Sequence, residues 1–295
     1  MHTTISQSNL KILTFDLEDW FRIYDGLGIS AMEKWESMPN LERELELICR
    51  LLEDEKIKAT FFCLGREAER NPQMIRKISN LGHEIGAHSF NHFKVNTLTE
   101  SHFREDASRT IYTLEEITGK KVKAYRAPGL KVTQNTFWAF ETLVDLGIEV
   151  DSSLVTHQRI GRQKIPNHPF IIDYKGVKIK EFPNSSIPLF RYAFNYASSG
   201  YFRLMPYWFL QKKIVESPYI MSYFHPRDFD IQIHRLIQAN LLMKLKYRIG
   251  TKSAFTKLEK LSEKVKWVSL NQAIAQMNWD VTESISFPPS DYFLP

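Results

Sequence analysis

The first half of the chain alternates between short apolar runs and longer segments with apolar residues at helical spacing. Short apolar runs are typical of buried strands, and the second pattern is typical of amphipathic helices. Alternation of this kind predicts parallel strands joined by right-handed crossovers, as in a barrel or a doubly wound sheet. The expected strands are 11–15, 59–64, 84–87, 122–126 and 148–151, and the expected helices are 41–52, 72–81, 99–118 and 133–146.

The alternation of strand and helix patterns stops between residues 166 and 217. Two apolar runs flank Lys175-Gly176 and predict a β-hairpin of strands 170–174 and 177–182. Residues 185–206 are rich in aromatic and serine residues, and we expect a long loop over the barrel mouth. Later segments predict a strand at 219–224, a basic helix at 231–264, a strand at 267–270 and a short helix at 271–277. We expect a single domain spanning 1–295, with a helical C-terminal part from about residue 231.

Composition narrows the class of protein. Hydrophobic residues make up 43% and charged residues 25%, which is enough for a well-buried core. The net charge of +5 comes without an arginine-rich block, so nucleic-acid binding is not expected. Cys49 and Cys63 lack metal-ligand spacing and are expected to be buried free thiols. The polar first ten residues and the lack of a long apolar run predict a cytoplasmic protein.

The basic segment 235–266 contains Leu241, Leu242 and Leu245 and raises the alternative of contact with a membrane surface. We expect instead a barrel helix whose basic face is solvated.

Two clusters of metal-binding residue types follow predicted strands. His88 and His92 are four residues apart, so both rings can reach one metal ion from a helix or a tight loop. Asp16, Glu18 and Asp19 cluster at the end of the first strand. Carboxylates packed together repel each other, and a cation would relieve that repulsion. Each cluster alone also fits a solvated surface.

Three further polar motifs lie at strand ends. Arg126 precedes Pro128-Gly129; the arginine can orient a carboxylate, and the glycine lets a substrate oxygen approach its backbone N–H. Asp151 begins the motif Asp-Ser-Ser, and His225 follows the late strand, where it could act as a general acid. Five such motifs at five strand ends predict one active site at the mouth of a barrel.

The order of these motifs resembles the polysaccharide deacetylase family of carbohydrate esterases, over roughly residues 11–230. The stretch 199–206 also resembles a segment of the surface-polysaccharide branch of that family. The resemblance implies an α/β fold, a distorted (β/α) barrel of about seven strands. It also implies one divalent metal ion, often zinc, held by two histidines and a carboxylate; cobalt, nickel and iron suit the same ligands.

The resemblance assigns roles to individual residues. His88 and His92 match the histidine ligands, Asp16 matches the catalytic base, and Arg126 matches the arginine that positions it. His225 matches the general acid. The remaining matches are Asp151, which would tune that histidine, and the oxyanion or substrate positions Pro128, Gly129, Tyr201 and Arg203.

The first motif departs from the family pattern, in which two aspartates are adjacent. Here Leu17 follows Asp16, so the metal carboxylate is Asp19 or Glu18. Asp19 has the usual side-chain length, whereas strand alternation places Glu18 on the same side as Asp16. We favour Asp19 at this point and keep Glu18 as the alternative.

The expected function is metal-dependent removal of an N-acetyl or other N-acyl group from an amino sugar, in surface-polysaccharide or O-antigen synthesis. The sugar would be nucleotide-linked, lipid-linked or part of an oligosaccharide. Alternatives are a deformylase of a lipid-linked amino sugar, a metal-free amidohydrolase of the same fold, and a catalytically dead carbohydrate-binding protein.

Overall fold

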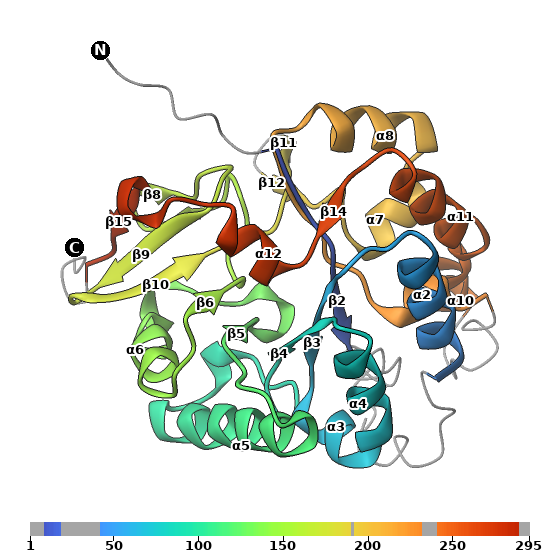
Figure 1. Cartoon of the computed structure of the whole chain (residues 1–295). Helices are drawn as coiled ribbons and strands as arrows, with labels where there is room; N and C mark the ends of the chain where they lie inside the picture. Colours follow the sequence, from blue (N-terminus) through green and yellow to red (C-terminus); the bar gives the residue numbers. More distant parts are fainter. Residues whose placement is uncertain (1–8, 19–41, 190–191, 232–240, 289–295) are drawn as a thin grey trace.

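The computed structural model describes residues 9–18, 42–189, 192–231 and 241–288. Its centre is a run of six parallel strands, each hydrogen-bonded to the next (Figure 1). In spatial order these are β2 (Thr14–Leu17), β3 (Thr60–Cys63), β4 (Glu84–Ala87), β5 (Ala124–Tyr125), β6 (Val150–Asp151) and β10 (Val177–Glu181). The predicted α/β class with parallel strands is confirmed.

The first strand is interrupted at Leu13 and contributes to two sheets. Its beginning, β1 (Leu10–Ile12), lies between β13 (Tyr219–Met221) and β14 (Trp267–Val268) in a parallel three-stranded sheet. Its continuation β2 pairs with β3 and, through Phe15, with Phe224 just after β13. The two sheets therefore share one continuous segment.

The strands curve into a ring. Its last gap, between β10 and β13, is spanned by two hydrogen bonds rather than by a continuous strand pairing. Past β10, the backbone N–H of Ser185 donates to the carbonyl oxygen of Met221 at 3.3 Å, and the Met221 N–H donates to Ser185 Oγ at 2.8 Å. The segment after β10 thus meets β13, which is the seventh strand around the ring. This arrangement agrees with the expectation of a distorted barrel of about seven strands.

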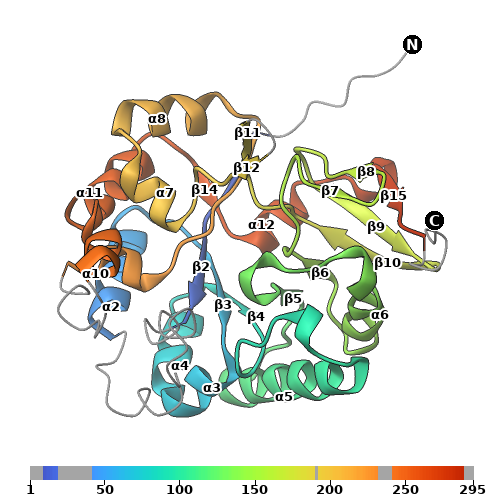
Figure 2. The same ribbon diagram turned by 180° about the vertical axis from the view of Figure 1, so that it is seen from behind.

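Helices lie around the outside of the strands, and α2, α10 and α11 share one flank while α6 lies on the opposite one (Figures 1 and 2). The first-half helices are α2 (Glu42–Asp54), α3 (Gly65–Arg70), α4 (Pro72–Asn80), α5 (Glu100–Thr118) and α6 (Trp138–Asp145). The later helices are α7 (Ser199–Leu204), α8 (Tyr207–Glu216), α10 (Leu241–Arg248), α11 (Thr251–Ser262) and α12 (Leu270–Ala275). No described helix is both long and apolar enough to cross a bilayer.

Smaller elements complete the chain. β9 (Phe170–Tyr174) pairs antiparallel with β10, as the hairpin prediction required, and β15 (Ser284–Ser286) pairs parallel with β9. Two short hairpins are β7 (Arg159–Ile160) with β8 (Gln163–Lys164) and β11 (Ile187–Leu189) with β12 (Tyr192–Phe194). The 3-10 turns are η2 (Val95–Thr97), η3 (Pro128–Leu130), η4 (Gln134–Thr136), η5 (Pro226–Phe229) and η6 (Trp279–Val281).

Local chemistry explains where several elements begin and end. Thr99 caps α5 by accepting a hydrogen bond from the His102 N–H, and Gly119 ends it in the left-handed conformation at φ 67°, both as expected. The helix expected at 133–146 instead divides into η4 and α6, because Thr133 and Thr136 form a capping box around a single turn. Both cysteines are buried free thiols.

The second half contains more structure than expected. The loop expected at 185–206 holds the β11–β12 hairpin and α7, and α8 follows directly. The long basic helix expected at 231–264 is divided at Gly250 into α10 and α11, and its residues 232–240 lie outside the described part. Gly250 adopts φ 75°, and a Cβ there would lie 2.3 Å from the carbonyl oxygen of Arg203. A side chain at this position would both strain the backbone and clash.

Candidate active site

The predicted site motifs converge where the parallel strands end. Asp16 lies in β2 and Glu18 directly follows this strand. His88 follows β4, Arg126 follows β5, and His225 lies four residues beyond β13. The carboxyl ends of parallel strands share one edge of a sheet, so side chains from distant parts of the sequence meet there. All five of these side chains are buried.

Arg126 is the central fixed charge. One terminal nitrogen of its guanidinium donates to Asp16 Oδ1 at 2.7 Å and to Thr14 Oγ1 at 2.8 Å. The Nε and the other terminal nitrogen donate to the carbonyl oxygen and the Oγ of Ser152, at 3.2 and 3.0 Å. The guanidinium carbon lies 4.1 Å from the centroid of the Phe62 ring. Bonds to both ends of the guanidinium leave it one orientation, which in turn fixes the Asp16 carboxylate.

His88 is oriented by a backbone carbonyl. Its Nδ1 lies 2.7 Å from the carbonyl oxygen of Arg126, so Nδ1 carries the hydrogen and Nε2 keeps its lone pair. Nε2 lies 3.3 Å from Asp16 Oδ2. Burial lowers the pKa of His88 to about 4, which leaves the ring neutral near pH 7. A neutral imidazole held in this way is suited to bind a metal through Nε2.

The segment from His88 to His92 is a loop rather than a helix. Ser89 and His92 have φ values of 70° and 62°, a conformation that side chains rarely adopt without support. Asp106 on α5 supplies that support by accepting hydrogen bonds from the N–H groups of Phe90 at 2.8 Å and Asn91 at 3.4 Å. The sequence gives no sign of this role, because Asp106 is one of several charged residues on a solvated helix.

Glu18 contacts His92 with one carboxylate oxygen and His225 with the other. Its Oε2 lies 2.8 Å from His92 Nε2, while its Oε1 lies 2.8 Å from His225 Nε2 and 2.7 Å from a guanidinium nitrogen of Arg227. Burial alone would raise the pKa of the Glu18 carboxyl, but Arg227, His92 and His225 hold it well below its usual range. Glu18 is therefore a carboxylate when the protein is folded.

The ligand atoms of Glu18, His88 and His92 all lie within 4.8 Å of one another. Glu18 Oε2, His88 Nε2 and the neighbouring Asp16 Oδ2 are buried and make no hydrogen bond of good geometry. Buried electron-pair donors without hydrogen-bond partners are costly unless a cation is bound between them. The donor set of two imidazoles and a carboxylate fits a divalent metal. Asp19, the carboxylate favoured from the sequence, lies outside the described residues.

His225 is held on both ring nitrogens. Besides Glu18 at Nε2, its Nδ1 lies 2.6 Å from Ser199 Oγ and 3.3 Å from Asp228 Oδ2. Burial and Arg227 would lower the pKa of His225, but Glu18 and Asp228 outweigh them and raise it. Arg203 on α7 completes the group, with its Nε 3.5 Å from Asp228 Oδ1. These surroundings favour the protonated form of His225, in which the ring can donate a proton.

Asp151 occupies a different place from the one expected. Its carboxylate accepts hydrogen bonds from the N–H of Ser153 at 2.8 Å and from Ser153 Oγ at 2.7 Å. It is paired in register with Glu181 of β10, and burial raises the pKa of both carboxyls. The charge of Arg126 acts on both carboxyls in the opposite direction and lowers their pKa. The carboxylate that contacts His225 Nδ1 is Asp228, which stands three residues after the histidine and was not singled out from the sequence.

The other residues that we expected to contact the oxyanion or the substrate are Pro128, Gly129, Tyr201 and Arg203. Pro128 and Gly129 lie in the turn η3, which begins two residues after Arg126, and Gly129 is exposed and has φ 65°. Tyr201 is exposed on α7 and packs on Phe194, with ring centroids 4.1 Å apart. Arg203, in contrast, is buried against Asp228.

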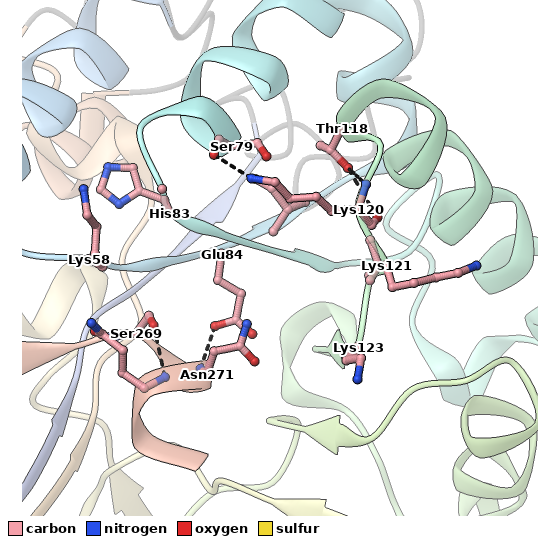
Figure 3. A pocket seen from close by; sticks show the side chains of 14 residues that line it. Lys58, Ser79, His83, Glu84, Thr118, Lys120, Lys121, Lys123, Ser269 and Asn271 are labelled. Carbon is pink, nitrogen blue, oxygen red and sulfur yellow. Dashed lines mark hydrogen bonds between the residues drawn. The ribbon is translucent and has the colours of Figure 1, made fainter. Parts of the chain in front are cut away.

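A pocket of about 330 Å³ lies at the other end of the strands (Figure 3). Lys58, Lys120 and Glu84 are among its lining residues, and Glu84 begins β4, whereas His88 follows it. The Glu84 carboxylate accepts hydrogen bonds from Thr60 Oγ1 at 2.6 Å and from the Asn271 N–H at the start of α12 at 2.9 Å. Glu84 thus anchors a helix to the sheet, and this pocket is separate from the candidate active site.

Comparison with known families matches two consecutive segments of the chain. Residues 35–150 match the polysaccharide deacetylase family, and residues 152–275 match a domain of unknown function, DUF3473. The first match includes His88, His92 and Arg126 but begins after Asp16 and Glu18, and the second includes His225.

Curated relatives resemble part of the chain. A peptidoglycan-N-acetylglucosamine deacetylase of Bacillus cereus is 33% identical over 35% of this chain and 38% of its own length. A chitooligosaccharide deacetylase of Azorhizobium caulinodans is 33% identical over 28% of this chain and 39% of its own. The chain thus spans less than half the length of each of these relatives.

Solved structures show the fold. A proposed polysaccharide deacetylase from Mycobacterium smegmatis superposes with a TM-score of 0.61 at 19% identity, over 90% of this chain and 88% of that one. A CE4 family pseudoenzyme from Bacillus anthracis gives 0.52 at 14% identity, over 95% and 69%. The chain therefore matches the polysaccharide deacetylase family over residues 35–150 and DUF3473 over residues 152–275, and its fold resembles that of a CE4 family protein.

Proposed function

We propose that this protein is a metal-dependent hydrolase that removes an N-acetyl group from an amino sugar. One observation carries the proposal: Glu18 Oε2, His88 Nε2 and Asp16 Oδ2 converge in a buried space without hydrogen bonds, beside a fixed arginine and a histidine whose pKa is raised. These are the groups that metal-assisted amide hydrolysis requires. The names of the curated relatives support a sugar amide as the substrate.

Glu18, His88 and His92 would hold the metal. Among the described carboxylates, Glu18 is the one grouped with both histidines, because its ligand oxygen and the two ring nitrogens all lie within 4.8 Å of one another. Its low pKa keeps it charged. A divalent cation bound there lowers the pKa of a water molecule and polarises an amide carbonyl. Zinc is our first choice, and cobalt, nickel or iron would suit the same donors.

The residues around this position divide the acid and base work. Arg126 occupies Asp16 Oδ1, which leaves Oδ2 to accept the proton of the attacking water. The water oxygen bonds to the carbonyl carbon, and the Gly129 N–H, on an exposed turn, stabilises the oxyanion. His225 Nε2 then gives its proton to the nitrogen as the carbon–nitrogen bond breaks. The products are acetate and a free amine.

The choice between Glu18 and Asp19 has a direct test. We expect Glu18→Gln to lose bound metal and Asp19→Asn to keep it, both measured by elemental analysis of the purified chain. The reverse pattern would transfer the ligand role to Asp19. Thermal unfolding of both variants shows whether either result reflects loss of the fold.

We further propose that residues 1–295 act as one domain. The family matches divide the chain near residue 151, yet the ring needs the residues on both sides of that point. β10 and β13, which lie after residue 151, pair with β6 and β1, which lie at or before it. The general acid His225 also comes from the second segment. Neither segment alone would hold a complete site.

The substrate test is release of acetate from N-acetylated chitooligosaccharides, peptidoglycan fragments and nucleotide-linked or lipid-linked amino sugars. We expect acetate release that a chelator abolishes. Release from one of these amino sugars would fit a role in surface-polysaccharide synthesis. Formate in place of acetate would favour a deformylase, and chelator-resistant activity would favour a metal-free amidohydrolase. No release from any of these compounds, despite sugar binding, would favour a carbohydrate-binding protein.

A further inference from the structure

The outer face of α10 is apolar where a barrel helix is normally polar. Leu241, Leu242 and Leu245 of α10, and Ile249 directly after the helix, are spaced as on one helical face and are 83%, 76%, 51% and 40% exposed. A helix on the surface of a soluble domain usually turns such a stripe towards the core. Among the described residues, this stripe faces outward instead.

The same segment is strongly basic. Residues 241–266, which include α10 and α11 and end just before β14, contain eight lysines and arginines and two glutamates. The whole chain has a net charge of only +5, so this segment carries more positive charge than the entire protein. Among the side chains of this segment that the structure describes, the exposed basic ones are Arg248, Lys252, Lys260, Lys264 and Lys266. Separation of charge on this scale indicates an anionic partner.

This face is tied to the candidate active site through α7. Lys257 Nζ on α11 donates to the carbonyl oxygens of Arg203 and Met205, both at 2.8 Å. At the other end of α7, Ser199 Oγ lies 2.6 Å from His225 Nδ1. Both views of the chain show α7, α10 and α11 side by side on one flank (Figures 1 and 2). A partner on this flank would therefore lie next to the element that supports the general acid.

We propose that α10 and α11 form a docking surface for an anionic lipid bilayer. Leu241, Leu242 and Leu245 of α10, together with Ile249, would enter the headgroup region, and the exposed basic side chains of the same segment would contact lipid phosphates. A combination of exposed leucines and excess positive charge fits a membrane better than a second copy of the chain, because two such faces would repel each other. The proposal stands independently of the deacetylase function, since binding to lipid requires no turnover.

The test is co-sedimentation of the full chain with vesicles of phosphatidylcholine alone or with about one third phosphatidylglycerol, a typical anionic fraction. We expect binding only to the anionic vesicles and its loss in high salt. Leu241→Ser/Leu245→Ser and Lys252→Glu/Lys260→Glu should each weaken binding about tenfold or more, because they remove insertion and attraction respectively. Val281→Ser and Lys178→Glu, at exposed positions elsewhere, are the matched controls and should bind like the wild type.

Two results would overturn the proposal. One is the absence of binding to anionic vesicles, or binding that the leucine and lysine variants leave unchanged. The other is a dimer in light scattering that Leu241→Ser/Leu245→Ser dissociates, which would assign the apolar stripe to a second copy. Circular dichroism of each variant checks the fold, and acetate release, measured on a water-soluble substrate, reports on the catalytic proposal separately.

Discussion

Arg126→Lys separates positioning of the base from metal binding. Lysine keeps the positive charge but offers a single nitrogen, so it can contact Asp16 and Thr14 and loses both bonds to Ser152. At about 1 kcal/mol for each hydrogen bond, we expect the free energy of unfolding to fall by about 2 kcal/mol. Because a misoriented base costs on the order of 100-fold in rate, kcat should fall by about that factor.

Bound metal should not change in this variant. The group that orients His88 is the backbone carbonyl of Arg126, which the substitution leaves in place. The assay combines urea unfolding, acetate release and elemental analysis on the same preparation. Arg104→Lys is the control, since Arg104 forms an exposed ion pair with Asp145 at 2.8 Å, and such pairs contribute about 1 kcal/mol or less. Wild-type kcat in Arg126→Lys would refute the positioning role. Loss of metal would refute the claim that the Arg126 side chain acts on the base and not on metal binding.

Three further substitutions test the surroundings of the site. Asp106→Ala removes the support of the histidine loop, and we expect metal affinity, measured by titration, to fall about 10- to 100-fold. Burial raises the pKa of Glu181 and Asp151 in the folded protein. Their contribution to the stability of the fold is therefore complete below their pKa in the unfolded state and is lost as pH rises through their pKa in the folded state. Glu181→Gln should therefore gain about 1–2 kcal/mol relative to the wild type between pH 5 and pH 8 in urea unfolding; an unchanged difference would contradict this. Asp228→Asn should lower the pKa of His225, which must be protonated to act, and thus move the alkaline fall of kcat/KM to lower pH; an alkaline limb at the wild-type pH would contradict the contact.

The alternating first half could be predicted closely, because each strand and helix there has a clear local signal. The expected strand 84–87 coincides with β4, and Thr99 and Gly119 bound α5 as expected. The second half departs from this pattern. α8 carries exposed apolar side chains that obscure its periodicity, and Gly250 divides a basic segment at a contact with Arg203 that only the tertiary structure creates.

The site follows the same division. His88, His92 and Arg126 could be predicted because each stands in a recognisable motif at a strand end. Asp106 and Glu181 could not, because their roles depend on a loop and a strand that approach them from distant parts of the sequence. Asp228 is close to His225 in sequence, yet its contact with Nδ1 depends on the tight turn η5.

The central claim is that a metal held by Glu18, His88 and His92 is required for hydrolysis. The most direct test is to remove metal by dialysis against a chelator, then restore it stepwise while measuring bound metal and acetate release from the substrate found in the screen. We predict that activity returns in proportion to occupancy and saturates at one ion per chain. His88→Ala and His92→Ala should bind no metal and release no acetate, whereas His102→Ala, at an exposed position on α5, should match the wild type. Full activity of the metal-free chain, or of either ligand variant without bound metal, would contradict the account.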